Sequence, residues 1–375
     1  MMILLGSVYL WGVFRVDVEL VFGVNASLSG LPYMVSLVSY AVSMFVAGRY
    51  MKTHRSWIIW IGVSSFVLGF WLASMSTAFY QLVLSYGFLI GTGVGLLYGV
   101  PIYIVQQSFE KNIGWYSGLI LMGFGLSNTI MTPIVNTVLS NQSIQDTMML
   151  LGWVALAVFS LTIWPLFQKL PQTIAQSSLP VTTYDKPAFR SLYVVYILSL
   201  ISGLTIVGIT YRVGIISYQF DDQFITIAIS IFAFFNGVSR PFFGGLVDRF
   251  GFFKVAFFSL MSLVASGFIS LFNNGQYPLL FAISYGAFWF GLGNWMALMP
   301  LSIKTIFEKS LFSKLYGKLF TAYGVAAVIG TLFSGAILDL TQTTWPIYTL
   351  IVCANIINVF LVLWLKQRYQ LKLFK

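Results

Sequence analysis

The residue with the clearest chemical potential is Arg240, which stands in an otherwise apolar run, IAISIFAFFNGVSRPFFGGL. A charge near the centre of a bilayer costs about 2.5–3.5 kcal/mol, so an arginine in a membrane span normally faces a cavity. None of the ten Asp and Glu residues falls in the centre of an apolar run. A guanidinium in that setting can bind a carboxylate bidentately. The alternative is an arginine that snorkels to the membrane face, since Gly244 follows only four residues later.

Aromatic and amide side chains in other apolar runs are candidates to complete a small binding pocket. Tyr323, in the sequence FTAYG, has a phenol that can donate a hydrogen bond to a carboxylate. The other candidate substrate contacts are Tyr9, Trp11, Tyr98, Trp295 and Asn236. Core packing and interfacial aromatic belts are the alternatives for each aromatic residue, because 18% of the chain is aromatic.

A second group of residues forms the motif GGLVDRFG, from Gly244 to Gly251, between two apolar runs. It resembles the G-x-x-x-D-R-x-G loop of the major facilitator superfamily. Gly244 allows two helices to approach closely, and Gly251 permits a tight turn. Asp248 can cap a neighbouring helix or bind a basic side chain and so hold one conformer, with Arg249 beside it. An ordinary polar turn is the alternative. The first half keeps the glycine, Gly48, but has a lysine, Lys52, in place of the aspartate.

The composition of the chain indicates the kind of protein in which these residues are positioned. The chain has 375 residues, of which 58% are hydrophobic and 8% charged, whereas soluble proteins carry about 25% charged residues. Its mean hydropathy is +0.88. We therefore expect an integral membrane protein in a lipid bilayer. A single cysteine, Cys353, and a single histidine, His54, exclude an internal disulfide and a Cys- or His-based metal site, so no metal or cofactor is expected.

Twelve apolar runs are long enough to be spanning helices, which need about 20 residues each. The longest polar interval, 169–190, divides them into six and six. This predicts an N-terminal bundle over 1–168, a cytoplasmic linker over 169–190 and a C-terminal bundle over 191–375. The twelve runs are 2–22, 31–50, 57–78, 80–108, 116–138, 147–168, 191–216, 224–244, 255–273, 278–300, 315–338 and 346–366.

The basic residues predict the orientation of these spans. With both termini in the cytoplasm, 17 of the 20 Lys and Arg residues fall on the cytoplasmic side and two, Arg15 and Arg212, fall outside. This asymmetry follows the positive-inside rule. It also explains the net charge of +10 without a nucleic-acid partner. We expect a multi-pass protein of the plasma membrane, and a monomer.

The two halves also repeat each other at an offset of 199 residues. The sequence Ser-Tyr-Gly at 85–87 recurs at 284–286, and Pro101, Gly118 and Gly125 recur as proline or glycine at the same offset. Two similar halves that both begin inside are the parallel repeat of a major facilitator. The predicted fold is all-α: a major facilitator fold with twelve transmembrane helices in two pseudo-symmetric six-helix bundles.

Several longer stretches resemble the oxalate/formate antiporter family of that superfamily. They are GSVYLWGVF (6–14), FEKNIGWYSGLILMGFG (109–125), KPAFRSL (186–192), FNGVSRPFFGGLVDRFG (235–251) and YGKLFTAYGVAAVIG (316–330). The resemblance implies transport of small carboxylates and gives Arg240 the task of binding the substrate. The oxalate transporter carries a lysine at the position of Tyr323, so a single fixed cation here favours a monoanion.

The leading hypothesis is therefore a secondary transporter, and not an enzyme, for a monocarboxylate such as formate or lactate, with oxalate as a further candidate. It would work by alternating access, as an antiporter or with a co-transported proton. A drug or sugar porter of the same superfamily is the first alternative. It is disfavoured because the spans have no buried acid and few amides. An inactive, sensor-like copy or an intramembrane enzyme is the second alternative, although no pair of nucleophile and base is evident.

Overall fold

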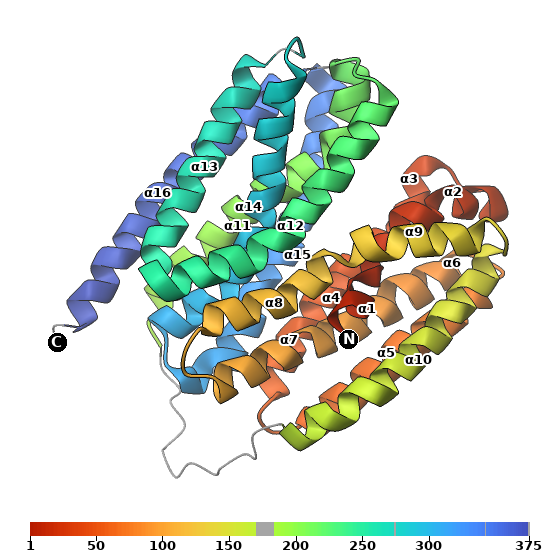
Figure 1. Ribbon diagram of the computed structural model, residues 1–375, viewed down its shortest axis with the longest axis horizontal. Coiled ribbons are helices and arrows are strands. Elements are labelled where there is room, and N and C mark those ends of the chain that lie inside the picture. Colours follow the sequence, from red (N-terminus) through yellow and green to blue (C-terminus); the bar gives the residue numbers. More distant parts are fainter. Residues whose placement is uncertain (170–183, 274, 342, 374–375) are drawn as a thin grey trace. The chain divides into compact units, whose positions relative to one another are not determined.

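The computed structural model describes residues 1–169, 184–273, 275–341 and 343–373, and every regular element within these ranges is a helix (Figure 1). Most of the predicted linker, residues 170–183, lies outside the described residues. The helices of the first half are α1 (Met2–Leu5), η1 (Gly6–Leu10), α2 (Trp11–Phe22), α3 (Ala26–Ser29), α4 (Leu31–Tyr50), α5 (Arg55–Ser74), α6 (Phe79–Leu82), η2 (Val83–Ile90), α7 (Gly91–Ser108), α8 (Ile113–Gly125), α9 (Ser127–Leu139) and α10 (Ile144–Lys169).

The second half has fewer and longer elements. They are α11 (Lys186–Arg212), η3 (Val213–Ser217), α12 (Asp222–Phe250), α13 (Phe252–Phe272), α14 (Pro278–Ile306), η4 (Lys309–Leu311), α15 (Phe312–Thr341) and α16 (Trp345–Leu373).

Within the described ranges, ten helical stretches are long and apolar enough to cross a membrane. They are Leu31–Tyr50, Arg55–Ser74, Phe79–Ser108, Ile113–Leu139, Ile144–Ile163, Lys186–Ser217, Asp222–Phe250, Phe252–Phe272, Lys309–Leu338 and Trp345–Leu371. The other two predicted spans fall on the segmented stretch from α1 to α2 and on α14, which is 29 residues long.

The helices pack into two compact units that do not simply follow chain order. Unit 1 contains 1–110, 123–179 and 313–324, and unit 2 contains 111–122, 180–312 and 325–375, in each case as far as these residues are described. The first part of α8 therefore belongs with the second-half helices, and the first part of α15 belongs with the first-half helices.

Close packing between helices in unit 1 depends on the glycines of α7. A side chain at Gly91 or Gly95 would overlap the backbone of α4, and one at Gly93 would meet Phe66 of α5. Small residues let helix backbones approach in lipid, where no hydrophobic force drives helices together. These glycines therefore allow α7 to pack closely against α4 and α5.

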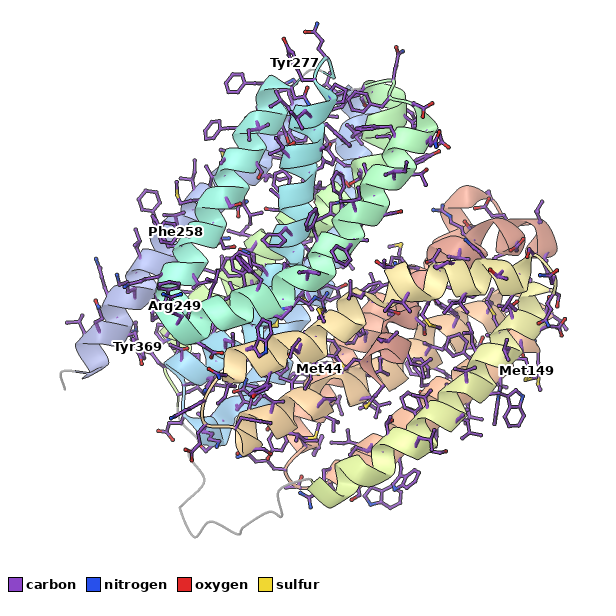
Figure 2. All side chains as sticks on the ribbon, in the orientation of Figure 1. Met44, Met149, Arg249, Phe258, Tyr277 and Tyr369 are labelled. Carbon is purple, nitrogen blue, oxygen red and sulfur yellow. The ribbon has the colours of Figure 1, made fainter. Side chains whose placement is uncertain are left out.

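The outward faces of the helices are apolar, as expected for a protein surrounded by lipid. Phe258 on α13 is 69% exposed and projects from its helix (Figure 2). Phe272 on the same helix and Leu161 on α10 are also largely exposed. In contrast, serines such as Ser7, Ser36 and Ser239 are buried. Large apolar side chains outside and small polar ones inside are what a bilayer solvent requires.

The structure corrects the predicted boundary at the end of α12. The apolar run that contains Arg240 was expected to end at 244, with the motif from Gly244 to Gly251 as a loop. Instead α12 continues as a helix to Phe250, and Gly251 alone separates it from α13. Gly251 has φ +80°, a conformation that favours glycine. The polar residues Asp248 and Arg249 end the hydropathy signal, but they do not end the helix.

Candidate functional site

The side chain of Arg240 is buried inside unit 2, and only 3% of the residue is exposed. Its Nη1 donates a hydrogen bond of 2.8 Å to the carbonyl oxygen of Leu121 on α8, and its Nη2 donates one of 3.3 Å to Oδ1 of Asn236. Both acceptors are uncharged. The structure therefore brings two predicted site residues, Arg240 and Asn236, together on one face of α12.

Asn236 is itself fixed by the neighbouring helix. Its Nδ2 donates to the carbonyl oxygen of Trp289 on α14 at 2.9 Å. This bond turns Oδ1 toward the guanidinium one helical turn away, because the two amide atoms point in opposite directions. The indole nitrogen of Trp289 donates to Oγ1 of Thr210 on α11 at 3.1 Å. The neighbouring helices α8 and α14 thus hold the orientation of Arg240 through backbone carbonyls and the Asn236 amide.

The other predicted contacts that come together do so in an aromatic cluster of unit 1. The hydroxyl groups of Tyr9 and Tyr323 lie 2.6 Å apart. The rings of Tyr9 and Tyr98 both pack edge-on against Phe124, with centroids 5.4 and 4.9 Å away. Tyr323 and Tyr98 are almost fully buried. We call Tyr9, Tyr40, Tyr98, Phe124, Phe320 and Tyr323 the aromatic cluster.

Tyr40 is the one tyrosine of this cluster that the sequence did not single out. It is fully buried, and its ring lies 5.3 Å from that of Tyr98, 4.9 Å from that of Phe320 and 6.0 Å from that of Tyr323. Its hydroxyl has no hydrogen-bond partner among the described residues. No sequence signal distinguishes Tyr40 from the other tyrosines. It lies in none of the motifs above, and no tyrosine stands 199 residues later in the chain.

The two predicted tryptophans do not join the aromatic cluster. Trp11 donates from its indole nitrogen to the carbonyl oxygen of Ser29 at 2.7 Å and packs on Tyr86. Trp295 is fully buried in unit 2 against Tyr196, with ring centroids 5.3 Å apart. Both rings occupy packed positions inside their own units.

The motif residue Asp248 binds the beginning of α8. Its Oδ1 accepts a hydrogen bond from the backbone N–H of Gly114 at 2.9 Å, and its Oδ2 accepts one from the N–H of Trp115 at 2.8 Å. The first N–H groups of a helix have no intrahelical partner, and a negative charge there interacts favourably with the helix dipole. The sequence predicts either a helix end or a basic side chain as the partner of Asp248. These two hydrogen bonds are made to a helix end.

Glycines bring α8 and α12 into direct backbone contact beside this cap. A Cβ on Gly244 would overlap the backbone of Gly114, and a Cβ on Gly118 would overlap the backbone of Arg240 and Pro241. Arg249, the other motif residue, lies over the ring of Phe250 at 5.1 Å and is labelled in Figure 2. We call the contact of Gly114, Gly118, Gly244 and Asp248 the α8–α12 seam.

Unit 1 contains a related contact between α4 and α15. A Cβ on Gly48 would overlap the backbone of Ser313 and meet the backbone of Gly317. Gly317 is the repeat partner of Gly118 at the offset of 199. Lys52 stands four residues after Gly48, just as Asp248 stands four residues after Gly244. The α4–α15 seam therefore repeats the glycines of the α8–α12 seam, with a cation in place of the carboxylate.

Known proteins with similar sequences belong to a superfamily of membrane transporters. The model of the Major Facilitator Superfamily matches residues 1–302 and 192–373. The oxalate:formate antiporter of Oxalobacter formigenes is 25% identical over 252 residues, which are 64% of this chain and 59% of the antiporter. The transporter YhjX of Escherichia coli, itself uncharacterized, is 24% identical over 86% of this chain and 82% of its own. The riboflavin transporter MCH5 of Saccharomyces cerevisiae is 21% identical over 88% of this chain and 68% of its own.

Solved structures agree on the fold. A bacterial homologue of the iron transporter ferroportin, in an outward-facing state, matches with a TM-score of 0.77 and 14% identity over 97% of both chains. The fucose:proton symporter FucP of E. coli matches with a TM-score of 0.74 and 14% identity over 97% of this chain and 96% of its own. Identities this low establish the fold alone.

Proposed function

Because the chain belongs to the major facilitator superfamily, a family of multi-pass membrane transporters and not of enzymes, we propose that it is a secondary transporter of a small organic anion, in particular a monocarboxylate. The observation that carries this proposal is the buried guanidinium of Arg240, held by the neutral oxygens of Leu121 and Asn236. An ionisable residue inside a membrane-spanning segment is costly and by default marks a substrate or ion pathway. Arginine can bind a carboxylate substrate in a planar, bidentate geometry.

The proposed preference for a monoanion depends on Tyr323. Its hydroxyl is paired with that of Tyr9 at 2.6 Å. A phenol of this kind can bind a carboxylate oxygen but adds no charge. We propose that Arg240 supplies the charge and that the aromatic cluster supplies neutral hydrogen bonds and apolar surface. The similarity to the oxalate:formate antiporter supports a carboxylate, and the chain spans only 59% of that protein.

The direct test is counterflow in proteoliposomes loaded with formate, lactate, acetate, oxalate and malonate in turn, with a sugar and a lipophilic cation as probes of the alternative porters. We expect exchange of labelled monocarboxylates by the parent. Arg240→Gln should abolish it, and Arg240→Lys should retain part of it, because lysine keeps the charge but loses the planar fork. Losing such an ionic contact costs about 2–5 kcal/mol, which is more than tenfold in affinity.

Arg190→Gln is the matched control, because Arg190 is an exposed arginine of the second half on α11. It should exchange at the parent rate. Parent affinity for monocarboxylates in a folded Arg240→Gln protein would place the anion site elsewhere. Transport of the sugar or the cation, without any carboxylate, would replace the proposal by one of the alternatives.

A further inference from the structure

A polar pocket that the proposed transport does not use lies at one end of unit 2. Its volume is about 450 Å³, and its walls are the end of α11 with η3, the ends of α13 and α15, and the start of α16. Tyr277 marks this end in Figure 2, because its carbonyl oxygen accepts a hydrogen bond from Asn273 of the lining at 3.4 Å. Pockets for small ligands commonly measure about 300–1,000 Å³, so the pocket can hold a small organic molecule.

Hydroxyl groups dominate the polar part of this lining. The residues that carry them are Ser217, Tyr218, Ser270, Thr343, Thr344 and Tyr348. The charged residue of the described lining is Arg212, which already makes an interaction of its own. Recognition of a ligand is therefore left to hydroxyl groups, which can both donate and accept hydrogen bonds. Such a lining suits a neutral ligand with several hydroxyl groups of its own.

One of these hydroxyls is buried and lacks a partner. Ser270 is 2% exposed, and its Oγ makes no hydrogen bond to any described residue. Ser266, one turn earlier on α13, instead donates to the carbonyl oxygen of Ser262 at 2.8 Å. Burying a hydroxyl without a partner costs folding free energy. A ligand hydroxyl in the pocket would supply the missing partner of Ser270.

The phenols favour a ligand that donates hydrogen bonds. Tyr218 donates its hydrogen to the carbonyl oxygen of Asn273 at 2.8 Å, and its oxygen lies 3.3 Å from that of Tyr348. Tyr348 is in turn 2.6 Å from the hydroxyl of the buried Tyr285. With its hydrogen used inside the protein, Tyr218 can only accept a hydrogen bond from a ligand. A ligand hydroxyl can donate that bond, whereas a carboxylate cannot.

An aromatic ring forms an apolar wall beside these hydroxyls. Trp345 begins α16, lines the pocket and is 60% exposed. A ring sugar carries a face of C–H groups next to its hydroxyls. Packing that face on the indole removes apolar surface of both partners from water. The pocket therefore offers hydrogen-bonding groups and an apolar surface together, which is the combination that a monosaccharide presents.

We propose that this pocket is a second binding site, for a small neutral polyol such as a monosaccharide. The ligand hydroxyls pair with Ser270 and Tyr218, and its C–H face packs on Trp345. The bonds of Tyr218 hold it in place before the ligand arrives, so binding costs little side-chain entropy. The site shares no residue with the proposed transport site, and a neutral ligand makes no use of the anion recognition proposed for Arg240.

The test titrates glucose into the purified full-length chain in lipid nanodiscs and measures binding by saturation-transfer NMR of the sugar. We expect saturable binding. Cyclohexanol, which keeps the ring but has a single hydroxyl, should compete at least about tenfold more weakly, because it loses most of the hydrogen bonds. Lactate, which probes the proposed transport site, should not displace glucose.

Two substitutions in the pocket decide the proposal. Ser270→Leu should abolish glucose binding by filling the pocket, and Trp345→Ala should weaken it by about tenfold because the apolar wall is lost. Ser160→Leu and Trp57→Ala are the matched controls, since both residues are exposed and lie outside the lining. Both controls should bind glucose with the parent affinity.

Absence of saturable binding, or parent affinity in folded Trp345→Ala, overturns the second site. Displacement of glucose by lactate would place the sugar at the Arg240 site and would overturn it as well. If Ser270→Leu does not fold, Trp345→Ala alone decides, because an exposed ring can be removed without opening the core. Carboxylate counterflow by the parent tests the proposed transport separately, so either proposal can fail without the other.

Discussion

The carboxylate of Asp248 accepts a hydrogen bond from the backbone N–H of Gly114 at 2.9 Å, so the last turn of α12 caps the first turn of α8. The two residues are 134 positions apart in the chain. The bond turns a short sequence motif into a link between helices. In an alternating-access transporter, a link of this kind would stabilise one conformer, and it would have to break when the helices separate.

Replacing this carboxylate should slow transport more than it weakens substrate binding. Asp248→Asn loses the negative charge at the start of α8 and sets an N–H₂ donor against one of the two backbone N–H groups. Hydrogen bonds to charged groups contribute about 1.5–3 kcal/mol, so we expect the maximal rate of counterflow to change by about tenfold or more. The half-saturation concentration should change little, because Asp248 binds α8 and not substrate.

Glu308→Gln is the control for Asp248→Asn, since Glu308 is an exposed acid of unit 2. It should leave both parameters at parent values. A large loss of affinity at an unchanged maximal rate would show that Asp248 acts on substrate binding instead.

The glycine next to this cap should tolerate no side chain. In Gly244→Ala the new methyl group overlaps the backbone of Gly114, so the helices must separate and the bonds of Asp248 must lengthen. We expect counterflow to fall by on the order of tenfold with normal membrane insertion. Gly245→Ala is the matched control, because its methyl group would meet only a ring carbon of Trp115 at 3.4 Å. Equal counterflow rates for the two variants would show that transport does not depend on close contact in the α8–α12 seam.

A second cation at the position of Tyr323 should change the preferred charge of the substrate. Tyr323→Lys replaces a neutral phenol, paired with Tyr9 at 2.6 Å, by an ammonium group. We expect the ratio of oxalate to formate exchange to rise by about tenfold, since one ionic contact contributes about 1.4 kcal/mol or more. Tyr80→Lys, at an exposed tyrosine of α6, should leave the ratio unchanged. An unchanged ratio in a folded Tyr323→Lys protein would exclude Tyr323 from the substrate site.

The orientation of the chain is open to a direct test by cysteine labelling in cells. The natural Cys353, which is exposed on α16, is first replaced by serine. Gln142→Cys and Gln276→Cys should react with an impermeant maleimide in intact cells. Lys52→Cys and Lys254→Cys should react only after permeabilisation, because the positive-inside rule places them in the cytoplasm. Labelling of Lys254→Cys in intact cells would reverse or break the predicted topology.

Hydropathy predicted the positions of the spanning helices well but missed where some of them break or continue. The predicted run 31–50 coincides with α4, Leu31–Tyr50. The run 2–22 is divided into α1, η1 and α2, and mean hydropathy does not distinguish a 3₁₀ turn from an α-turn. Likewise α12 extends six residues beyond the predicted end at 244. Polar residues end a hydropathy signal, whereas a helix continues as long as its backbone hydrogen bonds can form.

For the candidate site, the sequence indicates residue types more readily than their arrangement. Arg240 could be found because a charge in an apolar run is rare, and Asp248 because its motif has fixed spacing. The acceptor at Leu121 could not be found, since a backbone carbonyl has the same sequence signal at every residue. The pairing of Tyr9 with Tyr323 spans 314 residues. It depends on how helices from the two ends of the chain pack, which periodicity within one helix does not report.

The exchange of aspartate for lysine between the two glycine seams means that the two halves do not share one kind of cap. Separating Gly114 from Gly244 requires the loss of two charge-assisted hydrogen bonds. The ammonium group of Lys52 carries only donors, so it cannot accept hydrogen bonds from backbone N–H groups as Asp248 does. The seam of Gly48 and Gly317 and the seam of Gly114 and Gly244 therefore open by breaking different kinds of contact, although their glycines repeat.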